Sequence, residues 1–329
     1  MNSRNEKRLK RKKRRYLLII PFLLFILVGG VYGSFLAYKA MSAADEAHLE
    51  LERGDKSNLR DKTVDPGRDN ISVLFLGVDD GGERNYGERS RTDAIMLATF
   101  NREDKTVKML SIPRDSYVYQ PDRDRKDKIN HAHAYHGIDG TVNTVENLLD
   151  IPVDYYVRMN FKAFIEVVEA LNGIEVEVPM TFSEMDSRDR KDAIFLQKGV
   201  QTLNGEQALA LARTRKLDND IERGKRQQLI LQAIIREAAS ITSIHRYGDV
   251  IDALGNNITT NFRPSQLFSL QKYATGIETE SLVIEGKDSY INSVYYYELD
   301  EASISEVSQT LREHLGIVKK ENTDEEDSE

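Results

Sequence analysis

The segment from residue 211 to residue 228, LARTRKLDNDIERGKRQQ, combines four arginines and two lysines with scattered acids, directly before an apolar run. If its first half is extended, Arg213 and Arg215 point to the same side, because side chains alternate along a strand. Guanidinium groups form charge-assisted, two-pronged hydrogen bonds with phosphate oxygens. The segment is therefore a candidate site for a phosphate-bearing ligand.

The second half of this segment has helical spacing. Arg223, Arg226 and Gln227 are three and four residues apart and share one face of a helix, which Ile230 and Ile234 continue. The two isoleucines are predicted to be buried, so the two arginines turn inward as well. An inward guanidinium requires a partner, because an uncompensated buried charge is too costly.

The nearby acids do not balance this charge. Asp218 and Asp220 can pair with one or two of the four arginines, but not with all of them. The N-terminus of a helix also attracts anions through its free backbone N–H groups. We predict an anion-binding site where the helix begins. The alternative is a solvated, charge-dense loop.

Two acids stand beside predicted strands. Asp79 directly follows one apolar run, and Asp93 comes just before the next. Ligands of open α/β sheets gather at strand ends, so the two carboxylates can converge on one hard cation such as Mg²⁺ beside substrate phosphates. The alternative is structural: Asp79 caps a turn, and Asp93 pairs with Arg89 or Arg91.

A further arginine follows a strand that ends at a proline. Pro113 stops the apolar run before it, and Arg114 and Asp115 come next. An arginine fixed in this way presents a rigid donor fork that suits a phosphate. An ordinary surface loop is the alternative interpretation.

These residues lie among alternating strand and helix patterns. The sequence predicts strands at 71–78, 94–100, 106–112, 154–159, 174–179 and near 281–286, and helices at 141–149, 161–171, from 205 onward, 222–240, 265–275 and 301–315. Some strands are joined by short turns and others by crossovers. This mixture predicts a three-layer α/β/α domain on a mixed central sheet.

The N-terminus has the pattern of a membrane anchor. The first 15 residues carry nine Lys/Arg and one Glu, and an uncharged apolar run follows at 17–37. About 20 apolar residues cross a bilayer as a helix, whereas a cleaved signal peptide has an apolar run of only about 7–15. Basic residues before the run favour a cytoplasmic N-terminus. We predict an uncleaved, single-pass type II signal-anchor in the cell membrane, with the domain that follows it extracellular.

Charge and composition exclude several functions. The 329-residue chain has a net charge of −8, and the basic first 15 residues contribute +8, so the remainder carries −16. Such a chain is not expected to bind nucleic acid, because phosphate backbones require a basic face. There is no cysteine, which excludes disulfides, a thiol nucleophile and Cys-based metal sites.

The composition shifts divide the chain into five parts. They are a cytoplasmic basic segment at 1–15, the transmembrane signal-anchor at 16–38, a polar extracytoplasmic linker at 39–70, a folded domain at 71–318 and a disordered acidic tail at 319–329.

Seven stretches resemble, in order, the LytR–CpsA–Psr family of bacterial cell-wall enzymes, most of all its teichoic-acid-attaching members. They lie between about residues 71 and 240: VLFLGVDD, RSRTDAIMLATF, VKMLSIPRDSYV, KINHAHAYHG, VDYYVRMNFKAFIEVVEALNGIEVEVP, LQKGVQTLNGEQALALARTRK and DIERGKRQQLILQAI. The single-span anchor with the domain outside is also similar to that family.

The resemblance implies roles by motif position. Asp79 and Asp93 would hold Mg²⁺, or Mn²⁺ in its place, against a pyrophosphate, and Asp93 and Arg114 would act in catalysis. Asp93 could also be the base for an acceptor hydroxyl, and Asp220 would orient the arginines. The phosphates would be bound by Arg114, Arg213, Arg215, Arg223, Arg226 and Gln227, with a polyprenyl tail in an apolar tunnel.

The resemblance implies a phosphotransferase of cell-wall biogenesis. It would move a phosphorylated anionic glycopolymer, such as wall teichoic acid, from an undecaprenyl-pyrophosphate carrier to a peptidoglycan hydroxyl. Charge neutralisation and positioning suffice for such a transfer. Two other classes stay open: a pyrophosphatase or phosphodiesterase that uses water as acceptor, and a non-catalytic receptor that binds lipid-linked polymers and regulates.

Overall fold

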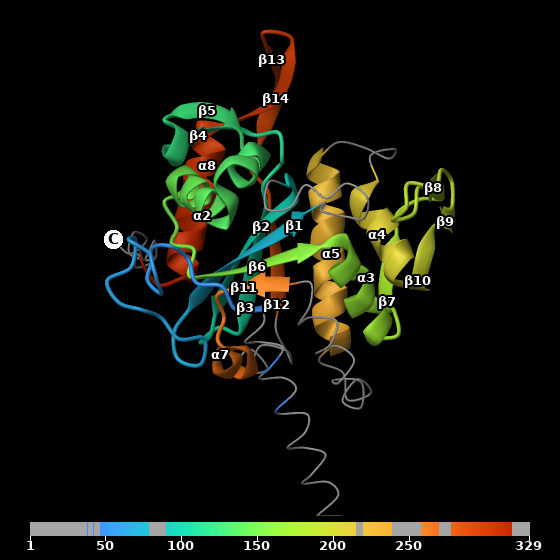
Figure 1. Ribbon diagram of the computed structural model, residues 1–329, viewed down its shortest axis with the longest axis horizontal. Helices are drawn as coiled ribbons and strands as arrows, with labels where there is room; N and C mark the ends of the chain where they lie inside the picture. The colour runs from blue at the N-terminus through green and yellow to red at the C-terminus, as the bar shows by residue number, and fades with distance from the viewer. Residues whose placement is uncertain are drawn as a thin grey trace, which may run out of the picture.

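Figure 1 shows the computed structural model, with a central sheet between two groups of helices. The structure describes residues 38, 42, 47–78, 90–214, 220–238, 258–269 and 278–317. None of the helices in these ranges is both long and apolar enough to cross a bilayer. The apolar run at 17–37 lies outside them.

The central sheet has six strands and mixed directions. Its order is β11-β6-β1-β2-β3-β12. β1 is antiparallel to β2, and β2 is antiparallel to β3, whereas β6 runs parallel to β1 and β12 parallel to β3. The strands are β1 (Ile71–Val78), β2 (Thr92–Asn101), β3 (Thr106–Ser111), β6 (Tyr155–Asn160), β11 (Ile258–Thr260) and β12 (Glu278–Leu282).

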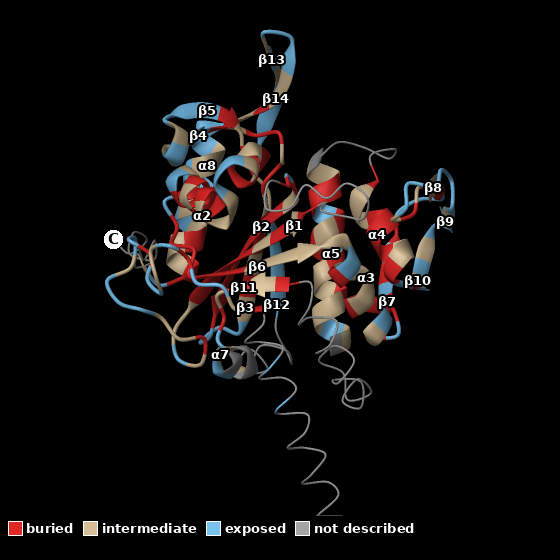
Figure 2. Cartoon of the chain, viewed as in Figure 1, coloured by how far each residue is buried: buried red, intermediate tan, exposed pale blue. Residues whose placement is uncertain are grey.

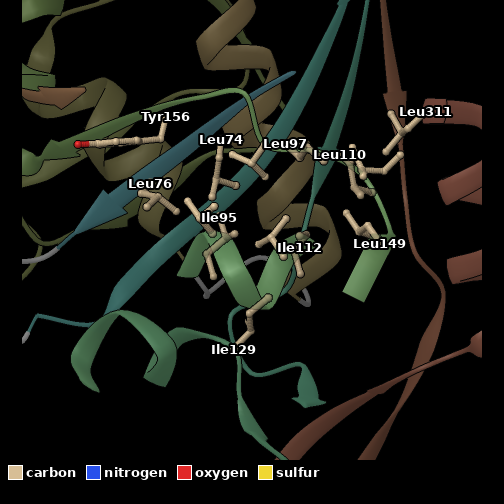
Figure 3. Packing of buried hydrophobic residues seen from close by; sticks show 14 of the residues in the cluster. Leu74, Leu76, Ile95, Leu97, Leu110, Ile112, Ile129, Leu149, Tyr156 and Leu311 are labelled. Carbon is tan, nitrogen blue, oxygen red and sulfur yellow. The ribbon is translucent and has the colours of Figure 1, made fainter. Parts of the chain in front are cut away.

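Side-chain alternation gives the sheet two buried faces. Leu74, Leu76, Ile95 and Leu97 point to one face and pack with helices α2 (Asn130–Leu149) and α8 (Glu301–His314), as Figure 3 shows. The intervening residues point to the other face, where they join a second cluster with Tyr155 and Phe262, whose rings stack 4.1 Å apart. Both faces are therefore covered, and the predicted mixed α/β fold with a central mixed sheet is confirmed.

A smaller lobe with its own core lies beside the sheet (Figure 1). It contains helices α3 (Phe161–Ala170), α4 (Gly205–Arg213) and α5 (Asp220–Ala238), together with strands β7 (Ile174–Val178), β8 (Phe182–Glu184), β9 (Ile194–Leu196) and β10 (Gly199–Leu203). Asn172 and Gly173 have positive φ values of 65° and 94° and form the turn between α3 and β7. Because α5 contacts both β3 and β7, it joins the lobe to the sheet.

The remaining elements are short and mostly peripheral. They are β4 (Tyr117–Gln120), a 3₁₀ turn η2 (Pro121–Arg123), β5 (Arg125–Lys128), α7 (Pro264–Ser269), β13 (Gly286–Ile291) and β14 (Val294–Leu299). β4 pairs with β5 and β13 with β14, each as an antiparallel hairpin. Figure 2 shows the β13–β14 hairpin standing out from the body, and Tyr297 is the one buried residue in its two strands.

Helix α2 is longer than the sequence predicts. The predicted helix at 141–149 is only its second half, and α2 begins at Asn130. His136 and Gly137 interrupt it with non-helical backbone angles, and Gly137 has a φ of 60°. The glycine hides the helical periodicity of the residues before it, although Ala132 and His133 are buried there.

The segment at 47–70, which the sequence assigns to a linker, packs against the domain. Apart from one helical residue, Ala47, and one isolated bridge at His48, it has no regular secondary structure. Arg53 donates to Glu146 at 2.5 Å, and Arg60 donates to both oxygens of Asp154 at 2.9 and 2.6 Å. Leu51 belongs to the main core. The segment is anchored by arginine–carboxylate pairs, whose partners lie about 90 residues further along the chain.

A buried histidine gives the fold a pH dependence. His314 is 6% exposed, and its ring nitrogens lie 2.8 Å from Thr99 Oγ1 and 2.8 Å from Thr106 Oγ1. Burial, with a smaller contribution from Lys108, lowers the pKa of His314 to about 4 from an ordinary value of 6.5. Between pH 4 and pH 6.5, the His314 side chain therefore binds a proton more readily in the unfolded chain than in the folded one.

We expect the free energy of unfolding to fall as the pH is lowered from 6.5 towards 4, because protonation favours the unfolded state over that range. Urea unfolding at several pH values measures this. In the variant His314→Gln, the part of this fall in the free energy of unfolding that is due to His314 should disappear. An unchanged pH profile in the variant would contradict the prediction.

Candidate active site

A cavity of about 560 Å³ lies between the central sheet and helices α3, α4 and α5. The sheet supplies apolar side chains from β1, β2 and β6, and the helices supply the opposite wall. Together these walls are formed mainly by Phe75, Met96, Val157, Met159, Phe161, Phe164, Val167, Leu209, Ile230, Leu231 and Ile234. Such a cavity suits the apolar part of an amphiphilic ligand.

The polar lining comes from element ends that meet at one end of this cavity. Asp93 lies near the start of β2, Arg114 follows β3, Arg213 ends α4 and Arg223 lies in the first turn of α5. Gln227 lies one turn further along α5. Among the described residues of the lining, the three arginines outnumber the two carboxylates, Asp93 and Glu184. This end of the cavity can therefore attract an anion.

Asp93 contacts Arg114, and Arg89, one of the two arginines considered as its structural partner, lies outside the described residues. Arg114 Nη1 donates to Asp93 Oδ1, and Arg114 Nε lies 3.5 Å from Asp115 Oδ2. Their side chains remain 34% and 25% exposed, so the pair lies at the cavity surface. The turn is held by Ser116, whose backbone N–H donates to Pro113 O at 3.0 Å. Asp93 and Arg114 thus combine a carboxylate and a fixed guanidinium at one point.

The predicted inward face of α5 is confirmed. Arg223 is 6% exposed and Arg226 5%, Ile230 is buried and Ile234 packs on the same core. Arg223 Nη2 lies 3.5 Å from the backbone oxygen of Asp93 and lines the cavity. Its guanidinium therefore lies at the cavity wall, beside Asp93.

Arg226 takes a different position from its neighbours. Its Nη2 donates to Thr214 O at 2.9 Å, at the end of α4, and it is not part of the cavity wall. Gln227 does line the cavity, and its Nε2 donates to Ala212 O at 3.2 Å. This contact joins the end of α4 to α5, the helix on which Arg223 and Gln227 also lie.

Arg213 is the last residue of helix α4, so the condition under which Arg213 and Arg215 would point to the same side, an extended segment, is not met at Arg213. Asn204 and Gln207 form reciprocal caps at the start of α4, and the helix runs to Arg213. The Arg213 guanidinium donates to Asp186 O at 3.2 Å and Asp189 Oδ1 at 3.3 Å. It also lies 5.4 Å from the ring centre of Phe161 and lines the cavity.

Asp79 and Arg215 lie outside the described residues, as does the side chain of Asp220 at the start of α5. Val78, which precedes Asp79, is paired with Thr92, the residue before Asp93.

Sequence reasoning missed the junction between β6 and α3. Asn160 caps α3 by accepting from Ala163 N at 2.8 Å, and both Asn160 and Phe161 line the cavity. The signal for the cap, an asparagine before an amphipathic helix, was present in the sequence. Nothing in the apolar pattern distinguished a side chain that lines a cavity, such as Phe164, from one that fills a core.

Gly224 allows α5 to approach β3 closely. A methyl group at this position would lie 2.5 Å from Oγ and 2.8 Å from Cβ of Ser111. Glycine inside a helix costs about 1 kcal/mol relative to alanine. This cost is offset by the close approach, which brings the neighbouring Arg223 to Asp93.

We expect Gly224→Ala to lower the stability by about 1–3 kcal/mol through overpacking. It should also weaken binding of inorganic pyrophosphate at the cavity arginines, because the start of α5 must move away from β3. Thermal unfolding and pyrophosphate titration measure the two effects. The double variant Gly224→Ala with Ser111→Gly should recover both. If Gly224→Ala alone is more stable than the wild type and binds the ligand normally, the close contact between Gly224 and Ser111 is unimportant.

Comparison with known proteins identifies the class to which this fold and cavity belong. Residues 34–313 match the LytR_cpsA_psr family, and the chain belongs to that family. It is 43% identical over 325 residues to a protein of Bacillus subtilis (strain 168) named polyisoprenyl-teichoic acid–peptidoglycan teichoic acid transferase TagT. That alignment covers 96% of this chain and 100% of TagT.

Solved structures agree with this relationship. A structure described as TagT bound to LIIa-WTA superimposes with a TM-score of 0.71 at 44% identity, and the match covers 82% of this chain and all of that one. Another, described as the LytR-CPS2A-psr family protein YwtF (TagT) with bound octaprenyl pyrophosphate lipid, gives a TM-score of 0.67 at 42% identity with the same coverage.

Proposed function

We propose that this protein is a transferase that moves a phosphorylated anionic glycopolymer, wall teichoic acid, from an undecaprenyl-pyrophosphate carrier to a hydroxyl of peptidoglycan. The observation that carries this proposal is the cavity, with apolar walls and arginines gathered at one end. The transferase name of the relative at 43% identity supports it, as do the related structures with lipid pyrophosphate and WTA bound.

The two parts of the cavity suit the two parts of such a carrier. The polyprenyl tail occupies the apolar space between the sheet and α3, α4 and α5, where burial of hydrocarbon is favourable. The pyrophosphate lies at the polar end, where Arg114, Arg213 and Arg223 donate charge-assisted hydrogen bonds. Arg215, predicted from sequence alone, would add a further donor.

The residues present also fit a divalent cation. Mg²⁺ in phosphate-transfer sites commonly uses one or two carboxylates, with substrate phosphates and water completing the shell. Asp93 supplies one carboxylate at the cavity surface, and Asp79 follows Val78 on the neighbouring strand. Asp79 and Asp93 would hold Mg²⁺, or Mn²⁺, which neutralises charge on the pyrophosphate when bound.

The transfer itself forms one P–O bond and breaks another. The acceptor hydroxyl oxygen attacks the phosphorus that carries the polymer, and the bond to polyprenyl phosphate breaks, so polyprenyl phosphate is the leaving group. Asp93 accepts the hydroxyl proton. Arg114 and Arg223 stabilise the charge on the transferred group and the leaving group, which is the main requirement of phosphoryl transfer.

We also propose that residues 17–37 anchor the protein in the cell membrane, as a single-pass type II protein with its catalytic domain outside. The length of the apolar run and the basic residues before it support this. The anchor would hold the domain where the lipid carrier presents its pyrophosphate. A mature N-terminus near Ala44, found by mass spectrometry, would contradict it.

Product analysis tests the proposed function. The full-length protein in detergent is incubated with a polyprenyl-pyrophosphate-linked polymer and Mg²⁺, with and without purified peptidoglycan. We expect polymer covalently attached to peptidoglycan together with released polyprenyl phosphate. Equal release without attachment would indicate a pyrophosphatase, and binding without release would indicate a receptor.

A further inference from the structure

The β4–β5 hairpin has two chemically different faces. Val118, Gln120 and Asp127 are buried, and β4 packs on α2. Tyr117, Tyr119, Lys126 and Lys128 alternate with them and point the other way. A solvent-facing strand surface normally carries small polar or charged residues, but this face carries two tyrosines, and Tyr119 is 39% exposed.

The β13–β14 hairpin extends this face with a third aromatic ring. The Tyr296 ring lies 4.7 Å from that of Tyr117, centre to centre. Lysines accompany the rings: Lys126 Nζ lies 5.8 Å from the Tyr117 ring centre, and Lys128 Nζ lies 5.5 Å from that of Tyr296. We call the surface of Tyr117, Tyr119, Lys126 and Tyr296 the hairpin face.

The hairpin face is directly connected to the candidate active site. Tyr297 N donates to Asp115 O at 2.9 Å at the base of β14. Lys128 Nζ donates to Asp115 Oδ1 at 2.7 Å, and the other oxygen of Asp115 lies 3.5 Å from Arg114 Nε. A molecule bound to the hairpin face would thus lie about two side chains from Arg114.

From this connection we propose that the hairpin face binds the glycan strand of peptidoglycan, which is the acceptor in the function proposed above and on which the inference rests. The flat, apolar faces of sugar rings pack on aromatic rings, while sugar hydroxyls remain solvated. The lysines complement carboxylates on the peptides that peptidoglycan carries. Bound here, a glycan strand presents a hydroxyl towards Asp93 and Arg114.

The position of the hairpin face and its chemistry both favour peptidoglycan as the molecule that binds there. The lipid carrier already has an apolar cavity on the other side of the sheet strands, lined by β1, β2 and β6. The acceptor must reach the same arginines from outside that cavity. The hairpin face is a partly exposed aromatic surface joined to Arg114: Tyr119 is exposed, and Tyr117 and Tyr296 are half-buried. Clustered apolar surface that remains accessible can mark an interaction site.

Sedimentation with purified peptidoglycan, stripped of attached polymers, tests the proposal on the full-length protein in detergent. Tyr119→Ala and Tyr296→Ala should each weaken binding roughly tenfold, as expected when an aromatic anchor is lost. Tyr296→Phe should bind normally, because it keeps the ring. The apparent KM for peptidoglycan should rise in the alanine variants, while binding of a polyprenyl pyrophosphate stays unchanged.

Tyr290→Ala is the matched control, because Tyr290 is 73% exposed and lies on the opposite face of the β13–β14 hairpin. It should bind peptidoglycan normally. The proposal is overturned if Tyr119→Ala and Tyr296→Ala bind normally, or if Tyr290→Ala is equally impaired. It is also overturned if only Lys126→Ala weakens binding, since that indicates simple charge adsorption.

The same measurements separate this inference from the proposed function. If wild-type protein binds peptidoglycan through the hairpin face but attaches no polymer, the function is wrong and the binding surface stands. If polymer is attached at the normal KM by Tyr119→Ala and Tyr296→Ala, the function stands and the surface is wrong.

Discussion

The variant Asp93→Asn is expected to lose about 10²–10⁴-fold in transfer rate, the usual range for removal of a general base. Asp93 lines the cavity and contacts Arg114, so its carboxylate is close to where a phosphate would bind. Asparagine keeps the size of the side chain but can neither accept the hydroxyl proton nor bind Mg²⁺ strongly. Because the pair with Arg114 is partly exposed, the fold should survive.

Release of polyprenyl phosphate, followed while Mg²⁺ is titrated, measures this effect. Asp79→Asn should behave similarly if it shares the cation, and both variants should lose Mg²⁺ dependence. Asp104→Asn serves as control, because Asp104 is an exposed carboxylate in the β2–β3 turn, at the far end of the same strand. Near-normal turnover by Asp93→Asn would remove it from the mechanism.

The variant Arg60→Ala should cost about 3–5 kcal/mol of stability, because it leaves a buried carboxylate without its cation. The side chains of Arg60 and Asp154 are only 11% and 3% exposed. Asp154 also accepts from Ser72 N at 2.9 Å, which ties the pair to the first residues of β1. Loss of the arginine therefore disturbs the sheet as well as the segment at 47–70.

Urea unfolding of the full-length protein in detergent measures this loss. Arg68→Ala is a suitable control, because Arg68 is an exposed arginine in the same segment. The double variant Arg60→Ala with Asp154→Ala should be less destabilised than the two single losses added together. If Arg60→Ala is as stable as the control, the segment contributes little to the domain.

The sequence by itself determined the elements and the chemical types at the site. The β2–β3 hairpin, β1 and the α3 helix lie where apolar patterns predict them, because these patterns are local and strong. Helical spacing alone placed Arg223 and Arg226 on the buried side of α5. Seven motifs in order also indicated the family, and the family match over residues 34–313 confirms it.

Only the tertiary structure decided which partners these residues meet. Asp93 pairs with Arg114, which is 21 residues away in the sequence. Arg223 and Arg226 lie on the same face of α5, yet Arg226 donates to Thr214 O and Arg223 lines the cavity. Arg60 pairs with Asp154, which lies 94 residues further along the chain. Sequence periodicity reports the face of an element on which a side chain lies, whereas its partner depends on how distant elements pack. For that reason the cavity, the docked segment at 47–70 and the hairpin face could be recognised only in three dimensions.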